Sequence, residues 1–138
     1  MPRAQVNGIL PHPKPHLMPG RPWAEAVVRR VEKPWGHEEI WAETARYAGK
    51  FLIVRAGEML SRQYHVHKEE TICVLSGRLS LELGRGPDEV VEMAPGESWH
   101  IPPGTVHRFC APHGDVRLVE VSSPELDDIV RLEDKYAR

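Results

Sequence analysis

The chain has 138 residues, of which 41% are hydrophobic and 28% charged, and its formal net charge at pH 7 is -2. This length is enough for one domain with its own hydrophobic core, and the composition is that of an ordinary globular protein. A net charge near zero offers no broad basic surface to nucleic acid or to a membrane, and no apolar run approaches membrane-spanning length. We therefore expect neither kind of partner.

Residues 1–25 are predicted to form an extended, proline-rich N-terminal arm. Prolines stand at positions 2, 11, 13, 15, 19 and 22. This density favours a polyproline-like conformation and leaves no room for the apolar region of a signal peptide. Such an arm has little of its own to bury, and a second subunit is a plausible surface for it. Together with the open edges of a β-sheet protein, the arm favours a homodimer.

The two cysteines indicate a reducing compartment. Cys73 and Cys110 lie in apolar, strand-like runs and are too far apart in sequence for a zinc–thiolate motif. We expect two reduced, buried thiols, which favours a cytoplasmic location.

Residues 26–123 are predicted to be a series of short strands separated by turns that contain glycine and proline. Many short strands without alternating helices favour an all-β sandwich or barrel. The turn at 84–88 is rich in glycine and also contains proline and aspartate. In chain order, the expected strands cover residues 26–33, 37–43, 49–56, 61–67, 70–76, 78–83, 89–93, 98–101, 105–111 and 116–122.

The tail, residues 124–138, is ambiguous between helix and strand. Ser123 could cap a helix with Pro124 at its first position, and the apolar run that follows could equally be a strand. We expect a short turn or helix that packs on the barrel.

The strongest chemical signal is a group of histidines near a glutamate. His65 and His67 are two residues apart, and side chains with this spacing share one face of a strand. Glu70 starts the next predicted strand, and His107 follows a proline–glycine turn. Three imidazoles and a carboxylate can converge on one divalent ion, and this donor set suits Zn, Mn, Fe, Co or Ni.

Strand alternation also predicts the neighbours of this site. Gln63 shares the inward face with His65, and Phe109 shares it with His107, so a metal site with an apolar wall would line a small-molecule pocket. Gln63 is either a further ligand, a substrate-binding residue or a polar residue that simply faces the pocket. Arg62 and Arg108 should point outward and be exposed.

Two separate segments, 57–77 and 96–107, resemble the paired signatures of the cupin superfamily. The second contains a glycine, a proline, a second glycine and the third histidine in the family's order. The first departs from the general pattern, because seven rather than five residues separate Gly57 from His65. The resemblance implies a jelly-roll barrel, also called a double-stranded β-helix.

A narrower resemblance covers roughly residues 31–138. The resemblance rests on four segments: Lys33-Pro-Trp-Gly36, residues 57–70, residues 101–108, and the end of the chain from Asp127. In the last segment, Ala137 stands where this family usually has a glycine. These segments are similar to the cupin-type (type II) mannose-6-phosphate isomerases, which also occur as the C-terminal domain of bifunctional mannose-1-phosphate guanylyltransferases.

This resemblance implies a metal-dependent interconversion of mannose 6-phosphate and fructose 6-phosphate. By carry-over of the motif, one divalent ion per chain would be held by His65, His67, Glu70 and His107. The reaction needs a general base near the sugar C1–C2 edge. Glu70 is a candidate if it is not used as a ligand, and Lys68 is a weaker one.

For the substrate, we expect contacts from Gln63, Arg55 and Phe109. Cations that could bind a phosphate are Arg55, Arg62, Lys68 and Arg108. Because one fold hosts many chemistries, two other readings remain open. One is a different metal enzyme, such as a dioxygenase, an epimerase or another sugar isomerase, and the other is a cupin that binds a sugar or metabolite without turnover.

Overall fold

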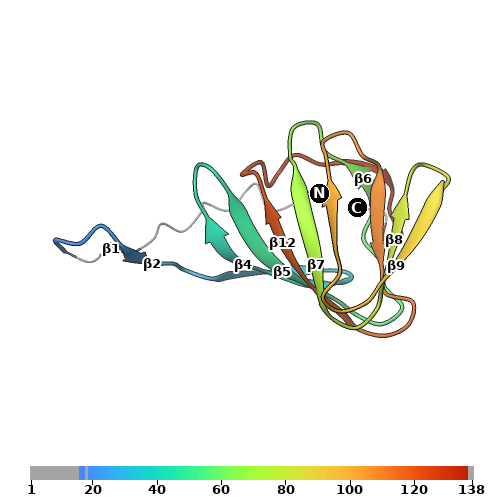
Figure 1. The fold of residues 1–138 in the computed structure, drawn as a ribbon, viewed down its shortest axis with the longest axis horizontal. Helices are drawn as coiled ribbons and strands as arrows, with labels where there is room; N and C mark the ends of the chain where they lie inside the picture. The colour runs from blue at the N-terminus through green and yellow to red at the C-terminus, as the bar shows by residue number, and fades with distance from the viewer. Residues whose placement is uncertain (1–15, 18, 137–138) are drawn as a thin grey trace.

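The computed structural model describes residues 16–17 and 19–136, and every regular element in this part of the chain is a β-strand (Figure 1). A six-stranded antiparallel sheet has the spatial order β10 (Ser98–Ile101), β7 (Glu70–Ser76), β12 (Val116–Ser122), β5 (Ala48–Val54), β4 (Gly36–Glu43) and β3 (Arg29–Lys33). A five-stranded antiparallel sheet has the order β13 (Val130–Glu133), β6 (Arg62–Tyr64), β11 (His107–Cys110), β8 (Leu79–Leu83) and β9 (Glu89–Met93). The predicted all-β jelly-roll barrel is confirmed.

Most of the predicted N-terminal arm lies outside the described residues, which begin at His16 and omit position 18. Within the arm, β1 (His16–Leu17) pairs with β2 (Ala24–Glu25) as an antiparallel ribbon. Figure 1 shows this ribbon outside the barrel, on the side where β4 lies. No helix among residues 16–17 and 19–136 has the length and apolar character that crossing a membrane requires.

The two sheets enclose one hydrophobic core. Burial alternates residue by residue along β7 and β12 and, from Lys50 onward, along β5, as expected for strands with one face against a core. In the six-stranded sheet the inward positions include Leu52, Ile72 and Leu118, which are at most 1% exposed. Leu81 and Phe109 face them from the other sheet at 0% and 1% exposure. Apolar burial here supplies the main driving force for folding.

At one end of the barrel, the same inward rows change from apolar to charged. Glu38 on β4, Lys50 on β5, Glu70 on β7 and Glu120 on β12 each continue the inward row of their strand, and all are buried. Glu120 is the register partner of Lys50 on the neighbouring strand, so these side chains lie side by side. The strand pattern thus builds a buried polar layer on top of the apolar core.

Part of the tail forms a strand, one of the two conformations that the sequence left open. Val130–Glu133 is β13, which pairs antiparallel with β6 and places Arg131 opposite Gln63. An unpaired edge of β6 would leave backbone groups without partners, and the tail satisfies them. The expected turn is present around residues 124–128, but the segment after it is a strand and not a helix, because its partner strand is distant in sequence.

Both cysteines are free thiols. Cys110 is buried, as predicted, and burial raises the pKa of its thiol to about 12. Cys73 is only half-buried, which corrects the expectation of two buried thiols.

Two turn glycines with nearly the same backbone conformation provide a matched test of the barrel's packing. Gly57 has φ 81°, and no heavy atom lies within 4 Å of the place that a Cβ would take. Gly77 has φ 80°, and a Cβ there would lie 2.1 Å from the carbonyl oxygen of Asp115. Gly57→Ala should cost about 1–2 kcal/mol, the strain of a left-handed alanine. Gly77→Ala adds a backbone collision, so we expect a loss of about 3 kcal/mol or more.

Denaturant unfolding of both variants measures this difference. Equal losses of unfolding free energy for the two substitutions would show that the close approach of Gly77 to the Asp115 carbonyl does not constrain the fold.

Candidate metal centre

Three predicted donors converge inside the barrel. Donor atoms of His65, Glu70 and His107 all lie within 4.8 Å of one another, and the three side chains are at most 3% exposed. His65 Nε2 is 3.2 Å from Glu70 Oε1, and His107 Nε2 is 3.7 Å from Glu70 Oε2. His65 directly follows β6, Glu70 starts β7 and His107 starts β11.

The hydrogen bonds of the two imidazoles direct their lone pairs toward Glu70. His65 Nδ1 donates to the backbone oxygen of Asp128 at 2.5 Å, and His107 Nδ1 donates to the backbone oxygen of Thr105 at 2.9 Å. Since a carbonyl only accepts, each Nδ1 carries the proton and each Nε2 is left as an acceptor. Anchoring one ring nitrogen in this way is the usual arrangement of a metal-binding histidine.

The atoms that face one another have no hydrogen-bond partner. His65 Nε2, His107 Nε2 and Glu70 Oε2 are all buried and unsatisfied. Burial lowers the pKa of His107, which favours its neutral imidazole. Acceptors that face each other in a buried site are costly unless a cation lies between them. A divalent metal ion fits this set of two imidazole nitrogens and one carboxylate.

The structure leaves His67 outside this group. The expectation that His65 and His67 share a strand face is wrong, because β6 ends at Tyr64 and the chain bends after it. His67 is exposed, whereas His65 is 3% exposed. The side-chain period of two applies only within a strand, so it no longer holds for this pair.

The bend that separates the two histidines is held by one carboxylate. Backbone amides of Val66, His67 and Lys68 donate to the carboxylate of Asp128 at 2.9, 2.6 and 2.8 Å. Burial alone would raise the pKa of Asp128, but these three amides lower it below its usual value. Asp128 therefore fixes the segment that carries His65 through both its side chain and its backbone oxygen.

A chain of buried ion pairs runs from the donor group across the polar layer. Lys68 Nζ is 3.2 Å from Glu70 Oε1 and 3.0 Å from Glu120 Oε2. Lys50 Nζ continues the chain, at 3.9 Å from Glu120 Oε2 and 3.1 Å from Glu38 Oε2. Lys68 is 4% exposed, so its ammonium lies inside the barrel and not in solvent.

These ion pairs set the charge states at the site. Burial would raise the pKa of Glu70, but the Lys68 ammonium holds it well below its usual range. Burial would lower the pKa of Lys68, but Glu120 and Glu70 raise it above its usual value. The carboxylate next to the imidazoles is thus ionised and able to bind a cation.

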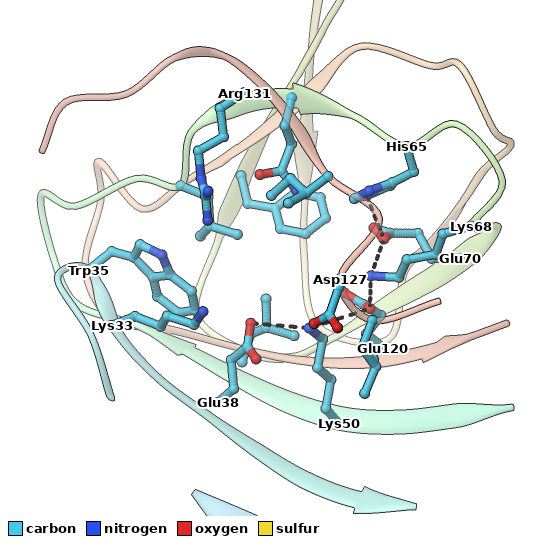
Figure 2. Close-up of a pocket in the computed structure, with 16 residues that line it drawn as sticks. Lys33, Trp35, Glu38, Lys50, His65, Lys68, Glu70, Glu120, Asp127 and Arg131 are labelled. Carbon is cyan, nitrogen blue, oxygen red and sulfur yellow. Dashed lines mark hydrogen bonds and ion pairs between the residues drawn. The ribbon is translucent and has the colours of Figure 1, made fainter. Parts of the chain in front are cut away.

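A pocket opens beside these residues, and Gln63 and Phe109 line it as predicted (Figure 2). Gln63 is the register partner of His107, so its amide lies next to the donor group. The hydroxyl of Ser61 donates to Gln63 Oε1 at 2.7 Å. Arg55 is not brought to this pocket; it is exposed and donates to the backbone oxygen of Pro34 at 2.8 Å.

The other two arginines that were predicted to bind a phosphate make ion pairs and hydrogen bonds within the barrel instead. Arg62 is ion-paired with Glu82 and Glu133 at 2.7 and 2.6 Å, and Arg108 Nε donates to the backbone oxygen of Leu60 at 2.8 Å. Both are buried, at 5% and 8% exposure, so the expectation of exposed charges was wrong.

Sequence reasoning missed several residues of the pocket. The missed residues that line it are Lys33, Trp35, Glu38, Lys50, Glu120, Asp127 and Arg131. Two signals could have helped. Lys33 and Arg131 lie in segments already noted for their family resemblance. Five residues separate Gly57 from Gln63, which is the general spacing of the first cupin ligand. With that register, Gln63 and His65, rather than His65 and His67, are the pair at the end of the strand.

Asp128→Ala tests the support of the bend that carries His65. Three amides lose a charged acceptor, so we expect faster hydrogen exchange at Val66, His67 and Lys68 and a fall of about 2–4 kcal/mol in unfolding free energy. The matched control is Asp127→Ala, because Asp127 lines the pocket but accepts none of these bonds. Unchanged exchange in the Asp128 variant would refute the role of this carboxylate.

Comparison with known proteins agrees with the fold and the motifs. Residues 21–134 match the family model described as the mannose-6-phosphate isomerase C-terminal domain. An RmlC-like cupin from Shewanella frigidimarina aligns with a TM-score of 0.64 and 15% identity over 72% of this chain and 86% of that one. At this identity the likeness concerns the fold alone.

Curated relatives are longer proteins. The xanthan biosynthesis protein XanB of Xanthomonas campestris pv. campestris is 39% identical over 114 residues, which are 80% of this chain and 24% of the relative. Mannose-1-phosphate guanylyltransferase 2 of Escherichia coli O157:H7 is 36% identical over 112 residues, which are 78% of this chain and 23% of the relative. The chain spans about a quarter of the length of these relatives. It belongs to the mannose-6-phosphate isomerase C-terminal family of cupin-like β-barrel proteins.

Proposed function

We propose that this domain catalyses the metal-dependent interconversion of mannose 6-phosphate and fructose 6-phosphate. The proposal depends most on three buried atoms that could bind a metal and have no hydrogen-bond partner. They lie beside a polar pocket and are His65 Nε2, His107 Nε2 and Glu70 Oε2. The family supports a sugar-phosphate substrate, and relatives are named as mannose-1-phosphate guanylyltransferases. A cytoplasmic location and a homodimer stay predictions from the sequence.

The metal would be held by His65, Glu70 and His107, and Gln63 lies beside them. The donor set suits Zn, Mn, Fe, Co or Ni. When bound, such an ion polarises a sugar carbonyl and stabilises negative charge on the neighbouring oxygens. Because the protein supplies few donors, open coordination positions remain for substrate oxygens.

The contacts suggest new roles for the two predicted catalytic residues. Both oxygens of Glu70 face imidazoles, so we assign it to the metal rather than to proton transfer. The raised pKa of Lys68 keeps it protonated, which prevents it from acting as a base and lets it stabilise negative charge instead.

We assign proton transfer to Asp127. Its carboxylate reaches into the cavity in Figure 2 and lines the same pocket as His65. Among the described residues it forms no ion pair, whereas Glu38 and Glu120 are both paired with Lys50. An aldose–ketose isomerase needs one carboxylate that can take a proton from one sugar carbon and return it to the next.

The isomerase proposal is tested by NMR detection of fructose 6-phosphate from mannose 6-phosphate. Protein is reconstituted in turn with Zn, Mn, Co and Ni, and a chelated sample serves as the blank. We expect turnover only with metal. A demonstrably filled site with no turnover in any metal would reject the isomerase and favour a dioxygenase, an epimerase, another sugar isomerase or a binding protein.

The metal assignment is tested separately by stoichiometry after gel filtration. His65→Ala and His107→Ala should each lose bound metal and lower turnover by more than about 100-fold. His113→Ala is the matched control, since His113 is exposed and faces Glu92 on the barrel surface. His67→Ala tests whether His67 is a metal ligand. If the variant retains its metal, the ligands from these motifs are His65, Glu70 and His107. If it loses the metal, His67 is the fourth ligand that the family motif implies.

A further inference from the structure

The pocket has two chemically different ends. Figure 2 shows His65, Lys68 and Glu70 on one side of the cavity and Lys33, Trp35 and Arg131 on the opposite side. All six residues line the same pocket. A ligand that reaches the metal donors with one end would therefore meet two cations with the other.

Charge is arranged differently at the two ends. Near the metal donors, Lys68 and Lys50 are buried within the chain of carboxylates. Across the pocket, Lys33 and Arg131 are only half-buried and border the cavity. Burial would raise the pKa of Glu38, but the ammonium groups of Lys50 and then Lys33 lower it below its usual value, so the Lys33 ammonium is close to the polar layer.

The total charge of the lining suits a dianion. The lysines and arginine of the lining are Lys33, Lys50, Lys68 and Arg131, and its carboxylates are Glu38, Glu70, Glu120 and Asp127. These two sets balance, so a bound divalent ion would leave an excess of about two positive charges. A phosphate monoester carries about two negative charges at neutral pH.

Both cations project from well-anchored backbone. Arg131 lies on β13 opposite Gln63, next to the donor group. Lys33 ends β3, pairs with Gly36 across a tight hairpin, and is followed closely by Trp35, which is 2% exposed and part of the core. A guanidinium and an ammonium held in this way can bind a phosphate without much loss of side-chain freedom.

We propose that Lys33 and Arg131 form an anion subsite that binds the phosphate of a phosphorylated aldose while its carbonyl end lies at His65, Glu70 and His107. This inference rests on the proposed function and replaces the arginines predicted from sequence. It also gives a role to two segments that resemble the family and supply no metal donor, Lys33-Pro-Trp-Gly36 and the tail around Arg131.

Calorimetric titration of the metal-loaded protein tests the subsite. Mannose 6-phosphate, mannose and inorganic phosphate are titrated into wild type, Lys33→Met and Arg131→Gln. Each substitution should weaken mannose 6-phosphate binding by about 10-fold or more, because a charge-assisted contact is lost. Mannose affinity and metal stoichiometry should not change. Arg85→Gln is the control, since it removes an exposed arginine from the turn between β8 and β9.

The outcomes separate this inference from the isomerase proposal. If both variants lose affinity for mannose 6-phosphate and wild type shows no turnover, the subsite is supported and the isomerase is rejected. Turnover by wild type with unchanged affinity in both variants keeps the isomerase and rejects the subsite. Equal affinity of wild type for mannose and mannose 6-phosphate also overturns the inference. If Arg131→Gln does not fold, Lys33→Met decides alone.

Discussion

The buried ion-pair chain Glu38–Lys50–Glu120–Lys68–Glu70 is the constraint on which the rest of the site depends. Charges this far from water are tolerated only when each has a partner, and removal of one partner typically costs about 3–5 kcal/mol. The chain exists because four inward strand positions at one end of the barrel carry charge instead of hydrocarbon. It keeps Glu70 ionised, and an ionised carboxylate between two neutral imidazoles is what a divalent cation requires.

The end of the chain completes what the strands begin. Asp128 holds the bend after β6 through three backbone amides, and its own backbone oxygen fixes the ring of His65. Beyond it, β13 adds Arg131 to the pocket wall, and Tyr136 hydrogen-bonds to Glu58. The tail is therefore a structural part of the pocket. Contacts of this kind support metal ligands from outside the coordination sphere and tune how they bind.

The sequence predicted those site residues whose position depends on local strand geometry, and it missed those whose position depends on distant contacts. Alternation within strands placed Gln63 and Phe109 in the pocket, because a period of two holds wherever the strand is regular. The same rule failed for His67, since β6 ends at Tyr64 and a distant carboxylate redirects the backbone. Lys33 and Arg131 were missed as pocket residues because their meeting across the barrel depends on the sheet topology, which local patterns do not encode.

Two imidazoles and one carboxylate are also the donor set of iron enzymes that activate O₂, so the donors alone do not select a reaction. The surrounding pocket provides the selection. Pockets for neutral, apolar substrates are lined mainly by hydrocarbon, whereas this one presents four carboxylates and four cations around a single cavity. A polyhydroxylated, anionic molecule can exchange its hydration for hydrogen bonds to such groups, and an apolar one cannot. The lining therefore favours a sugar phosphate over the hydrophobic substrates that the same metal ligands could serve.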